Sequence, residues 1–293
     1  MKKLFTVIFV LLLMNIYCKK TETPVEIKTE NKEQSAAVVD ADTIVLTTLE
    51  WEPYIGESIK GKGYVYQIVE EAFKKVGKKV VIKFYPWSRT VQMSQDGDVD
   101  GHFPEWYGDS RLDNWIFSDS FPGGPMGLYK RIGDNIKFSV DPQKDPEKAL
   151  RALKNYKFGA TREYINTAEF DRAAGLNIPE SLSADEKKAL EAQKYLQVEL
   201  ADSDEVSLKK LFGKRLDLIV IDQYVAKSLI VQKYPHYLDS LEFMNPPLEI
   251  KPLYICFSKK TPNYQEKCDL FNKGLSMIKA DGSLDKIMRD NGF

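Results

Sequence analysis

The sequence predicts an α/β protein of two lobes, each a mainly parallel β-sheet flanked by helices, with two hinge crossings between them. Strand and helix patterns alternate from residue 43 to the C-terminus. The segments between successive strands are long enough to hold a crossover helix, which parallel neighbours require. At 293 residues with 43% hydrophobic content, the chain has enough apolar side chains for two lobes of roughly 100 to 130 residues each.

The first cycle of strands and helices occupies residues 43–131. Apolar residues at positions 65, 68, 69, 72, 73 and 76 recur with the spacing of one helix face, and the pattern ends at Gly77. The loop at 49–62 carries Trp51 and Tyr54. The predicted strands are 43–48, 79–84, 99–103 and 126–131, and the predicted helices are 63–76 and 87–95.

A second cycle follows and repeats the alternation. Ser183 and Glu186 have the spacing of a capping box, which predicts an exposed helical insertion at 183–194. The other predicted helices are 145–153, 164–174, 203–212, 223–233, 262–279 and 283–289, and the predicted strands are 157–161, 196–200, 216–221 and 253–258.

The order of these elements predicts a discontinuous first lobe, because the chain enters the second lobe near residue 130 and returns near 252. We assign residues 43–130 and 252–293 to lobe 1 and residues 131–251 to lobe 2. The hinge segments are expected at 128–132 and 248–253. Parallel sheets place their sites outside the carboxyl ends of the strands, so the ligand is expected in the cleft between the lobes.

The N-terminus predicts export. Lys2 and Lys3 precede an apolar run at 4–14 that is too short to span a bilayer, so residues 1–17 are interpreted as a signal peptide. An exported protein is expected in the periplasm or at the cell surface.

The three cysteines allow different roles. Cys18 resembles the acylated cysteine of a bacterial lipoprotein, although Tyr17 stands where a small residue is usual. The polar segment 18–42 would then be a flexible tether to a lipid anchor in the membrane, and simple cleavage is the alternative. Cys256 and Cys268 are compatible with a disulfide or with two buried thiols.

Composition argues against several other classes of protein. The net charge is −1 with basic and acidic residues interspersed, so we expect no nucleic-acid partner. Two histidines and three cysteines make a zinc site or a Cys–His nucleophile improbable. The run DGDVDG from Asp96 to Gly101 opens like a calcium loop, but Tyr107 stands where the bidentate Glu is needed. We expect no metal and no cofactor, and the lack of catalytic motifs favours a binder over an enzyme.

The stretch 98–120 contains the best candidate for a ligand contact. Arg111 follows the end of a predicted strand and lies among the aromatic residues Trp106, Tyr107 and Trp115. A guanidinium there suits bidentate capture of a carboxylate on an organic ligand. The alternative is a surface arginine on a loop whose aromatics belong to the core.

This stretch resembles the family 3 extracellular solute-binding proteins, the polar amino-acid receptors of ABC importers. The acidic-Gly strand, the loop with an arginine and the F-S-D segment at 117–119 occur in the family's order, and the resemblance covers residues 43–293. It implies the Venus flytrap fold of periplasmic binding proteins, a monomer, and delivery of a small solute to an ABC permease. Arg111 falls on the family's carboxylate-binding arginine, but Glu105 and Trp106 replace the small residues that precede it.

Other cleft residues follow from the resemblance and from their positions after strands. Tyr54 stands where the family places an aromatic against the ligand, and Asp222 matches its amine-binding aspartate, although Asp222 also suits a helix N-cap. The strand-to-helix turn with Arg162 and Tyr164 suits an anion. Trp51, Trp87 and Trp106 are candidate stacking platforms, against the alternative of ordinary core. The remaining candidates are Arg89, which equally suits a helix surface, and His102, for which a structural role is favoured.

Two other functions remain open at this stage. The chain also resembles periplasmic cyclohexadienyl dehydratases, in which a desolvated carboxylic acid such as Glu105 or Glu163 would protonate a leaving hydroxyl. A solute-sensing lipoprotein without a transporter is the second alternative.

Overall fold

The computed structural model describes residues 43–293. The predicted signal peptide at 1–17, Cys18 and the tether at 18–42 lie outside the described residues.

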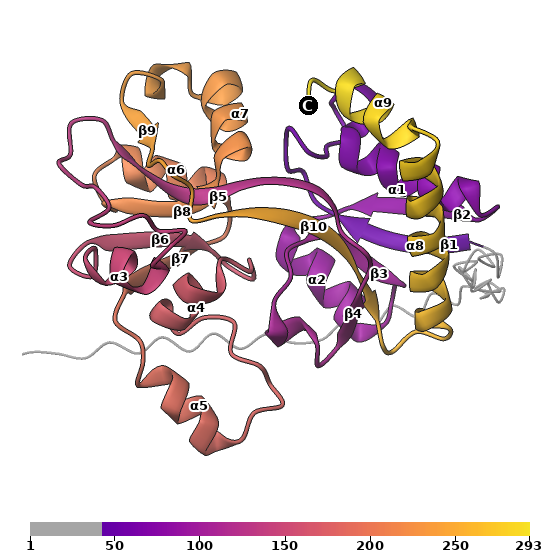
Figure 1. The fold of residues 1–293 in the computed structure, drawn as a ribbon, viewed down its shortest axis with the longest axis horizontal. Coiled ribbons are helices and arrows are strands. Elements are labelled where there is room, and N and C mark those ends of the chain that lie inside the picture. Colours follow the sequence, from indigo (N-terminus) through magenta and orange to yellow (C-terminus); the bar gives the residue numbers. More distant parts are fainter. Residues whose placement is uncertain (1–42) are drawn as a thin grey trace, which may run out of the picture. The chain divides into compact units, whose positions relative to one another are not determined.

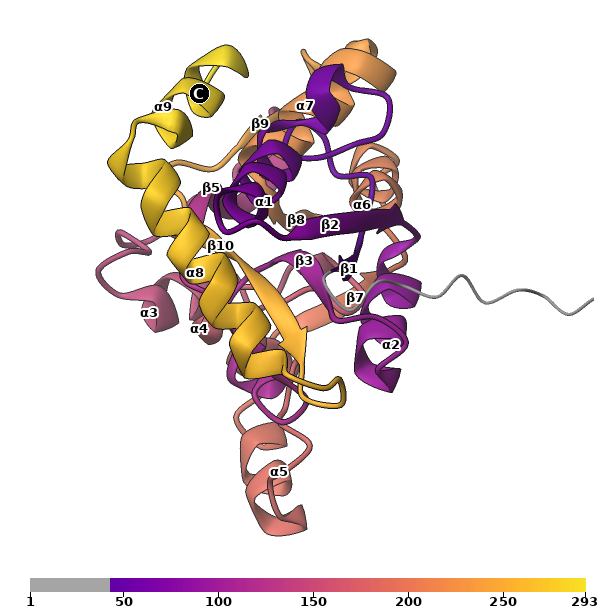
Figure 2. The ribbon, with the colours of Figure 1, turned by 90° about the vertical axis from the view of Figure 1, so that its right-hand side faces the viewer.

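The first sheet forms around β1 (Thr43–Thr48), which pairs in parallel with β2 (Lys79–Phe84) on one side and with β3 (Gly101–Glu105) on the other. Because β1 lies between β2 and β3, the two crossover helices must cover opposite faces if both connections are right-handed. Figures 1 and 2 show α1 (Tyr64–Lys75) and α2 (Trp87–Asp96) on opposite sides of this sheet.

The second sheet repeats this plan around β6 (Lys157–Thr161). It pairs in parallel with β7 (Gln197–Ala201) and β8 (Leu218–Asp222). β8 is buried along its whole length, as expected for a strand covered on both faces. The helices of this part of the chain are α3 (Pro146–Arg151), α4 (Ala168–Ala174), α5 (Ala184–Glu191), α6 (Asp204–Phe212) and α7 (Gln223–Lys233).

Two long strands join the sheets. In β5 (Phe121–Arg131), residues 121–126 pair antiparallel with residues 249–253 of β10 (Glu249–Ser258). Beyond this contact β5 pairs with β8 of the second sheet and β10 pairs with β3 of the first, so the β5–β10 pairing links the two sheets (Figure 1). The predicted hinge segment 128–132 instead lies within the second sheet, because its residues pair with β8 and with β9 (Leu241–Phe243).

The remaining elements complete the two lobes. The C-terminal helix α8 (Tyr264–Ala280) packs along α1 and is followed by α9 (Ser283–Asp290), and β4 (Trp115–Phe117) pairs with β10. Three short 3-10 helices are η1 (Lys60–Lys62), η2 (Asp109–Arg111) and η3 (Pro235–Tyr237).

Several predicted elements have different bounds in the structure, and two of these differences have a clear physical cause. The strand predicted at 99–103 is β3 at 101–105, and Pro104 does not end it: Glu105 still pairs with Tyr254, past an irregularity in the β10 register that accommodates the missing N–H. The helix predicted at 164–174 begins only at Ala168, because Thr167 is its N-cap and accepts a hydrogen bond from Phe170 N.

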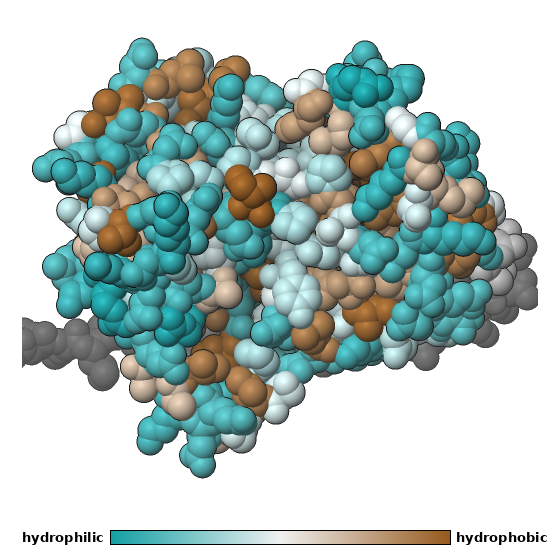
Figure 3. All heavy atoms as spheres, in the orientation of Figure 1, coloured by the Kyte–Doolittle hydropathy of each residue, from teal (hydrophilic) through white to brown (hydrophobic). Residues whose placement is uncertain are grey.

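Most large apolar side chains of residues 43–293 are buried or partly buried in two hydrophobic core clusters. On the face in Figure 3, hydrophilic residues cover most of the surface and hydrophobic residues form small separate groups. No helix within residues 43–293 is long and apolar enough to cross a membrane.

Close packing of α1 against α8 gives a test of the fold. A Cβ at Gly274 on α8 would lie 1.9 Å from the carbonyl oxygen of Ala72, whereas a Cβ at Gly133 would meet nothing within 4 Å. Because the two helix backbones must then separate, we expect Gly274→Ala to lower the free energy of unfolding by about 2 kcal/mol. Gly133→Ala is the control, and we expect a change below about 0.5 kcal/mol. Equal effects of both variants in urea unfolding would contradict this packing.

Candidate functional site

The candidate site lies where the carboxyl ends of the strands of both sheets meet. In each sheet the strand order reverses beside one strand, at β1 and at β6, and such a switch point opens a crevice for ligands. The loop after β1 carries Trp51 and Tyr54, and the loop after β6 carries Glu163 and Tyr164. Side chains from these loops meet across the space between the sheets.

Five aromatic side chains form what we call the aromatic cluster, namely Trp51, Tyr54, Trp87, Trp106 and Tyr164. Trp51 is central: its ring stacks on Tyr54 at 4.6 Å and meets the edge of Trp106 at 5.2 Å. Tyr164 from the other sheet lies 6.4 Å from Trp51, 5.8 Å from Trp87 and 6.0 Å from Trp106. All five were predicted as site residues, and the structure brings them together.

Two buried aspartates of the second sheet receive hydrogen bonds from this cluster. Asp222 ends β8, caps α7 through Tyr224 N and Val225 N, and accepts the Tyr54 hydroxyl at 2.8 Å. Asp204 begins α6 and accepts Trp51 Nε1 at 3.2 Å. These contacts join the two sheets through neutral donors.

The two aspartates have no cation as a partner among the described residues. Neither forms an ion pair with any of residues 43–293, and each is at least 95% buried. Burial raises the pKa of Asp222 to about 7, against the hydrogen bonds that it accepts. Burial likewise raises the pKa of Asp204 to about 6, although hydrogen bonds from Thr161, Trp51 and Tyr164 oppose the shift. The cleft therefore contains two carboxyl groups that would gain from a positive partner.

Arg111 is buried at the other side of the cluster and already has a carboxylate partner. Its Nε donates to Glu105 Oε2 at 2.8 Å, and Glu105 also accepts Trp106 N and lies 3.5 Å from His102 Nε2. Burial alone would raise the pKa of Glu105, but the Arg111 charge and the hydrogen bonds outweigh it and hold that pKa below its ordinary value. Glu105 is therefore ionised and neutralises Arg111.

The main-chain oxygen of Glu163, in the loop after β6 of the second sheet, accepts hydrogen bonds from two side chains on the side of the first sheet. The carbonyl of Glu163, a residue with φ of +63°, accepts Arg111 Nη2 at 2.5 Å and Trp87 Nε1 at 3.1 Å. This contact is a further bridge between the sheets.

Two cavities that share lining residues border the cluster. We call the first the inner cavity; it has about 10 Å³ and is lined by the aromatic cluster except Tyr54, together with Leu49, Pro104, Glu105 and Leu253. The indole N–H of Trp106 is buried there without a hydrogen-bond partner among the described residues. The outer cavity has about 510 Å³ and shares Leu49, Trp51, Trp87 and Tyr164 with the inner one. Its charged lining consists of one cation, Lys233, and of Glu50, Glu52, Glu57, Asp202, Asp204 and Glu205.

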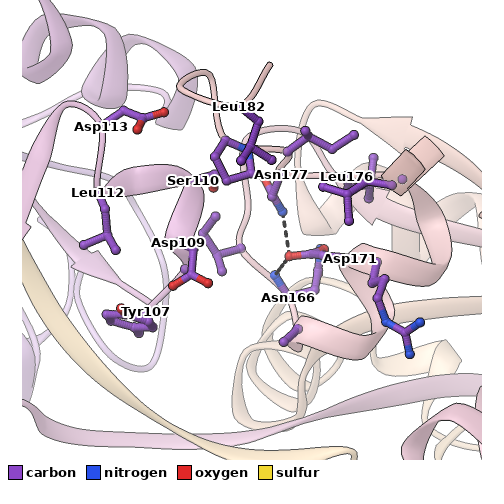
Figure 4. A pocket seen from close by; sticks show the side chains of 18 of the residues that line it. Tyr107, Asp109, Ser110, Leu112, Asp113, Asn166, Asp171, Leu176, Asn177 and Leu182 are labelled. Carbon is purple, nitrogen blue, oxygen red and sulfur yellow. Dashed lines mark hydrogen bonds between the residues drawn. The ribbon is translucent and has the colours of Figure 1, made fainter. Parts of the chain in front are cut away.

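A third and larger cavity lies beside β10. We call it the side cavity; it has about 800 Å³ and is bounded by the loop 107–113, by part of the segment 165–190 and by residues 249–254. Asp171 on α4 is held here by Asn166 Nδ2 at 2.8 Å and Asn177 Nδ2 at 2.7 Å (Figure 4). Asn177 also donates to Tyr164 O at 2.9 Å, so this network positions one member of the aromatic cluster.

The structure does not bring every predicted residue to the cluster. Arg89 is exposed on α2, and Arg162 is exposed beside Asp202, 3.4 Å away. Because α4 begins only at Ala168, the helix N-terminus expected at the turn after β6 is absent there, and the anion site at this turn stays a prediction. Sequence reasoning missed Asp204, whose S-D-E motif after a strand carries the same signal as Asp222.

The remaining sequence predictions concern cysteines and metals. Cys256 and Cys268 are both buried free thiols, so the disulfide alternative does not hold. Within residues 43–293, no group of His, Cys, Asp and Glu side chains has the arrangement of a metal site.

Sequence comparison identifies one matching family. The profile of bacterial extracellular solute-binding proteins, family 3, matches residues 44–291. A search of curated proteins finds no match.

Solved structures share the fold at low sequence identity. An ancestral arginine-binding protein bound to arginine has a TM-score of 0.63 and 21% identity, covering 86% of this chain and 99% of its own. The arginine-, lysine-, histidine-binding protein of Geobacillus stearothermophilus has a TM-score of 0.62 and 15% identity, covering 85% and 95%. A histidine kinase sensor domain with similarity to periplasmic binding proteins has a TM-score of 0.63 and 15% identity, also covering 85% and 95%. These similarities confirm the predicted two-lobed α/β fold.

The raised pKa of Asp222 predicts a pH dependence of stability. In the unfolded chain this carboxyl ionises near its ordinary pKa of 3.8, whereas the folded protein keeps the proton up to a pKa of about 7. Its stabilising contribution is therefore complete below the unfolded value and is lost as the pH rises through 7. Between about pH 6.5 and about pH 8, we expect the wild type to lose about 1 kcal/mol more unfolding free energy than Asp222→Asn.

Urea unfolding at both pH values measures this difference. Asp239→Asn, at an exposed position, is the control and should follow the wild type. An identical pH dependence in wild type and Asp222→Asn would show that this carboxyl is already ionised at the lower pH.

Proposed function

The chain belongs to family 3 of the bacterial extracellular solute-binding proteins, and on this premise we propose that it binds a small amine-bearing solute, such as an amino acid, in the cleft and delivers it to an ABC permease. The observation that carries the proposal is the pair of buried carboxyl groups, Asp204 and Asp222, beside the aromatic cluster without a cation. A protonated amine would supply the missing charge, and the aromatic faces would favour the same cation.

The geometry gives each element a role in binding. The aromatic rings of Trp51 and Trp106 belong to the first sheet, and the two aspartates belong to the second. A solute bound between them contacts both sheets at once. It therefore favours the arrangement in which the sheets are close, and β5 and β10 absorb the motion that brings them together.

The same proposal covers partners and location. The permease recognises the ligand-bound form, the receptor acts as a monomer, and a lipid at Cys18 tethers it to the membrane through the segment 18–42. Relatives named for arginine, lysine and histidine binding support an amine-bearing solute.

Sensing is the second candidate function, because the fold also matches a histidine kinase sensor domain. Deleting the gene separates the two functions: a receptor for import is required for uptake of its solute, whereas a sensor is required only for the response to it. The dehydratase alternative gains no support from its two candidate acids. Glu105 is ionised against Arg111, and the side chain of Glu163 is 48% exposed.

Binding measurements test the proposal directly. We expect calorimetry with a panel of amino acids, amines and amino amides to find a ligand whose affinity falls at least about tenfold in Asp222→Asn and in Asp204→Asn. Loss of a desolvated charge partner has an effect of this size or larger. Asp239→Asn is the control, because it makes the same substitution at an exposed position, and this variant should bind like the wild type.

Two results would contradict the proposal. One is a folded protein that binds no member of the panel. The other is a ligand whose affinity is the same in wild type and in both aspartate variants, since it would bind elsewhere.

A further inference from the structure

The internal partner of Arg111 limits which solutes the cleft can take. Arg111 is the residue that would hold a ligand carboxylate, yet its Nε donates to Glu105 Oε2 at 2.8 Å. Both side chains are more than 90% buried. A carboxylate arriving at Arg111 would meet the Glu105 charge within a few ångströms in a site with little water to screen it.

The other donors that face the second sheet are also occupied. The main-chain carbonyl of Glu163 accepts from Arg111 Nη2 and from Trp87 Nε1. This oxygen is neutral and belongs to the chain itself. A ligand carboxylate that bound the guanidinium through Nε and Nη2 would have to displace both acceptors, Glu105 and the Glu163 carbonyl. At Nη1 it would meet the Glu163 carboxylate, whose Oε2 lies 3.9 Å away.

The charge balance of the cleft points the same way. Asp204 and Asp222 have no ion-pair partner among residues 43–293, and Arg111 is neutralised by Glu105. The outer cavity adds Glu50, Glu52 and Glu57 to its lining, against one lysine, Lys233. A ligand with a free carboxylate adds another negative charge to this site, whereas an organic cation reduces the imbalance.

One buried donor still lacks an acceptor. Trp106 is only 4% exposed and lines the inner cavity, and its indole N–H has no hydrogen-bond partner in the described structure. That cavity of about 10 Å³ has room for one water-sized group. A neutral oxygen of the ligand fits there, next to the ionised Glu105, better than a charged carboxylate does.

From these four features, and resting on the proposed function, we infer that the cleft selects amino amides, which combine a protonated amine with a neutral carbonyl oxygen, over the corresponding free amino acids. The amine lies towards Asp204 and Asp222 and the carbonyl oxygen accepts from Trp106. Glu105 is thus a specificity-determining residue, because it occupies Arg111 in place of a ligand carboxylate.

The test compares ligands that differ only in the charge of one group. Binding of arginine, lysine, glutamine and tyrosine is compared by calorimetry near neutral pH with binding of their C-terminal amides, which have nearly the same shape. For the pairs that bind, the amide is expected to bind at least tenfold more tightly than the acid. An acid that binds as tightly as its amide, or more tightly, overturns the inference.

Two variants test the role of Glu105. Glu105→Gln keeps the shape but frees the Arg111 charge, and it is expected to shrink the amide preference at least tenfold. Glu105→Gln combined with Arg111→Gln replaces the ion pair by a neutral pair, and it is expected to keep that preference. Thermal melting establishes that each variant is folded. If Glu105→Gln does not fold, the inference is tested by the amide and acid affinities of the wild type and of the double variant. An unchanged preference in folded Glu105→Gln, or a lost one in the double variant, overturns the assignment of Glu105.

Trp106→Phe tests the neutral oxygen, because it keeps an aromatic ring and removes the N–H. The variant is expected to bind the amide at least fivefold more weakly, and an unchanged affinity overturns this contact.

The outcomes also separate the two proposals. If acids bind better than amides and lose affinity in Asp222→Asn, the solute-receptor function stands and the amide inference fails. If no member of either series binds, both fail.

Discussion

The antiparallel pairing of β5 with β10 is the constraint on which the cleft depends. Residues 121–126 pair with 249–253, and beyond this contact β5 continues into the second sheet and β10 into the first. The pairing keeps the carboxyl ends of the central strands, β1 and β6, opposite one another, so the loops that follow them face each other across the cleft. Trp51 and Tyr54 can then reach Asp204 and Asp222, although 153 and 168 positions separate the bonded residues.

Within this frame the buried Glu105–Arg111 pair sets the electrostatics of the site. Removing two charges from water costs several kcal/mol for each ion, and their attraction offsets this cost only if hydrogen bonds satisfy both groups. Here Trp106 N and the Glu163 carbonyl provide those additional bonds. The pair adds little net stability on this reasoning. Its consequence is that Arg111, whose guanidinium lies over the Trp115 ring, is already neutralised by Glu105.

The sequence predicts most of the framework, because parallel strands leave continuous apolar runs and helices leave a periodic face. Strands 43–48, 79–84 and 157–161 and helix 223–233 have the predicted bounds. Predictions failed where tertiary contacts decide the structure. β3 continues past Pro104 because β10 pairs with it irregularly, and the turn after β6 stays non-helical because Asp171 holds Asn166. The aromatic cluster could be predicted from residues after strand ends, but Glu105 as the partner of Arg111 could not, since nothing in the spacing shows which way a side chain turns.

The charge balance also bears on the proposed dependence of closure on binding. Bringing the sheets together removes Asp204 and Asp222 from water, and the neutral donors Trp51 and Tyr54 compensate this loss only in part, so burial raises the pKa of both carboxyl groups. A proton or an organic cation can each complete the compensation, and the two compete for Asp222 because its pKa is about 7. An organic cation that contacts both sheets stabilises only the close arrangement. A proton on Asp222 neutralises the carboxyl without any contact from the first sheet. Under the proposed function, closure driven by the solute therefore requires that the organic cation stabilise the close arrangement more than protonation of Asp222 does.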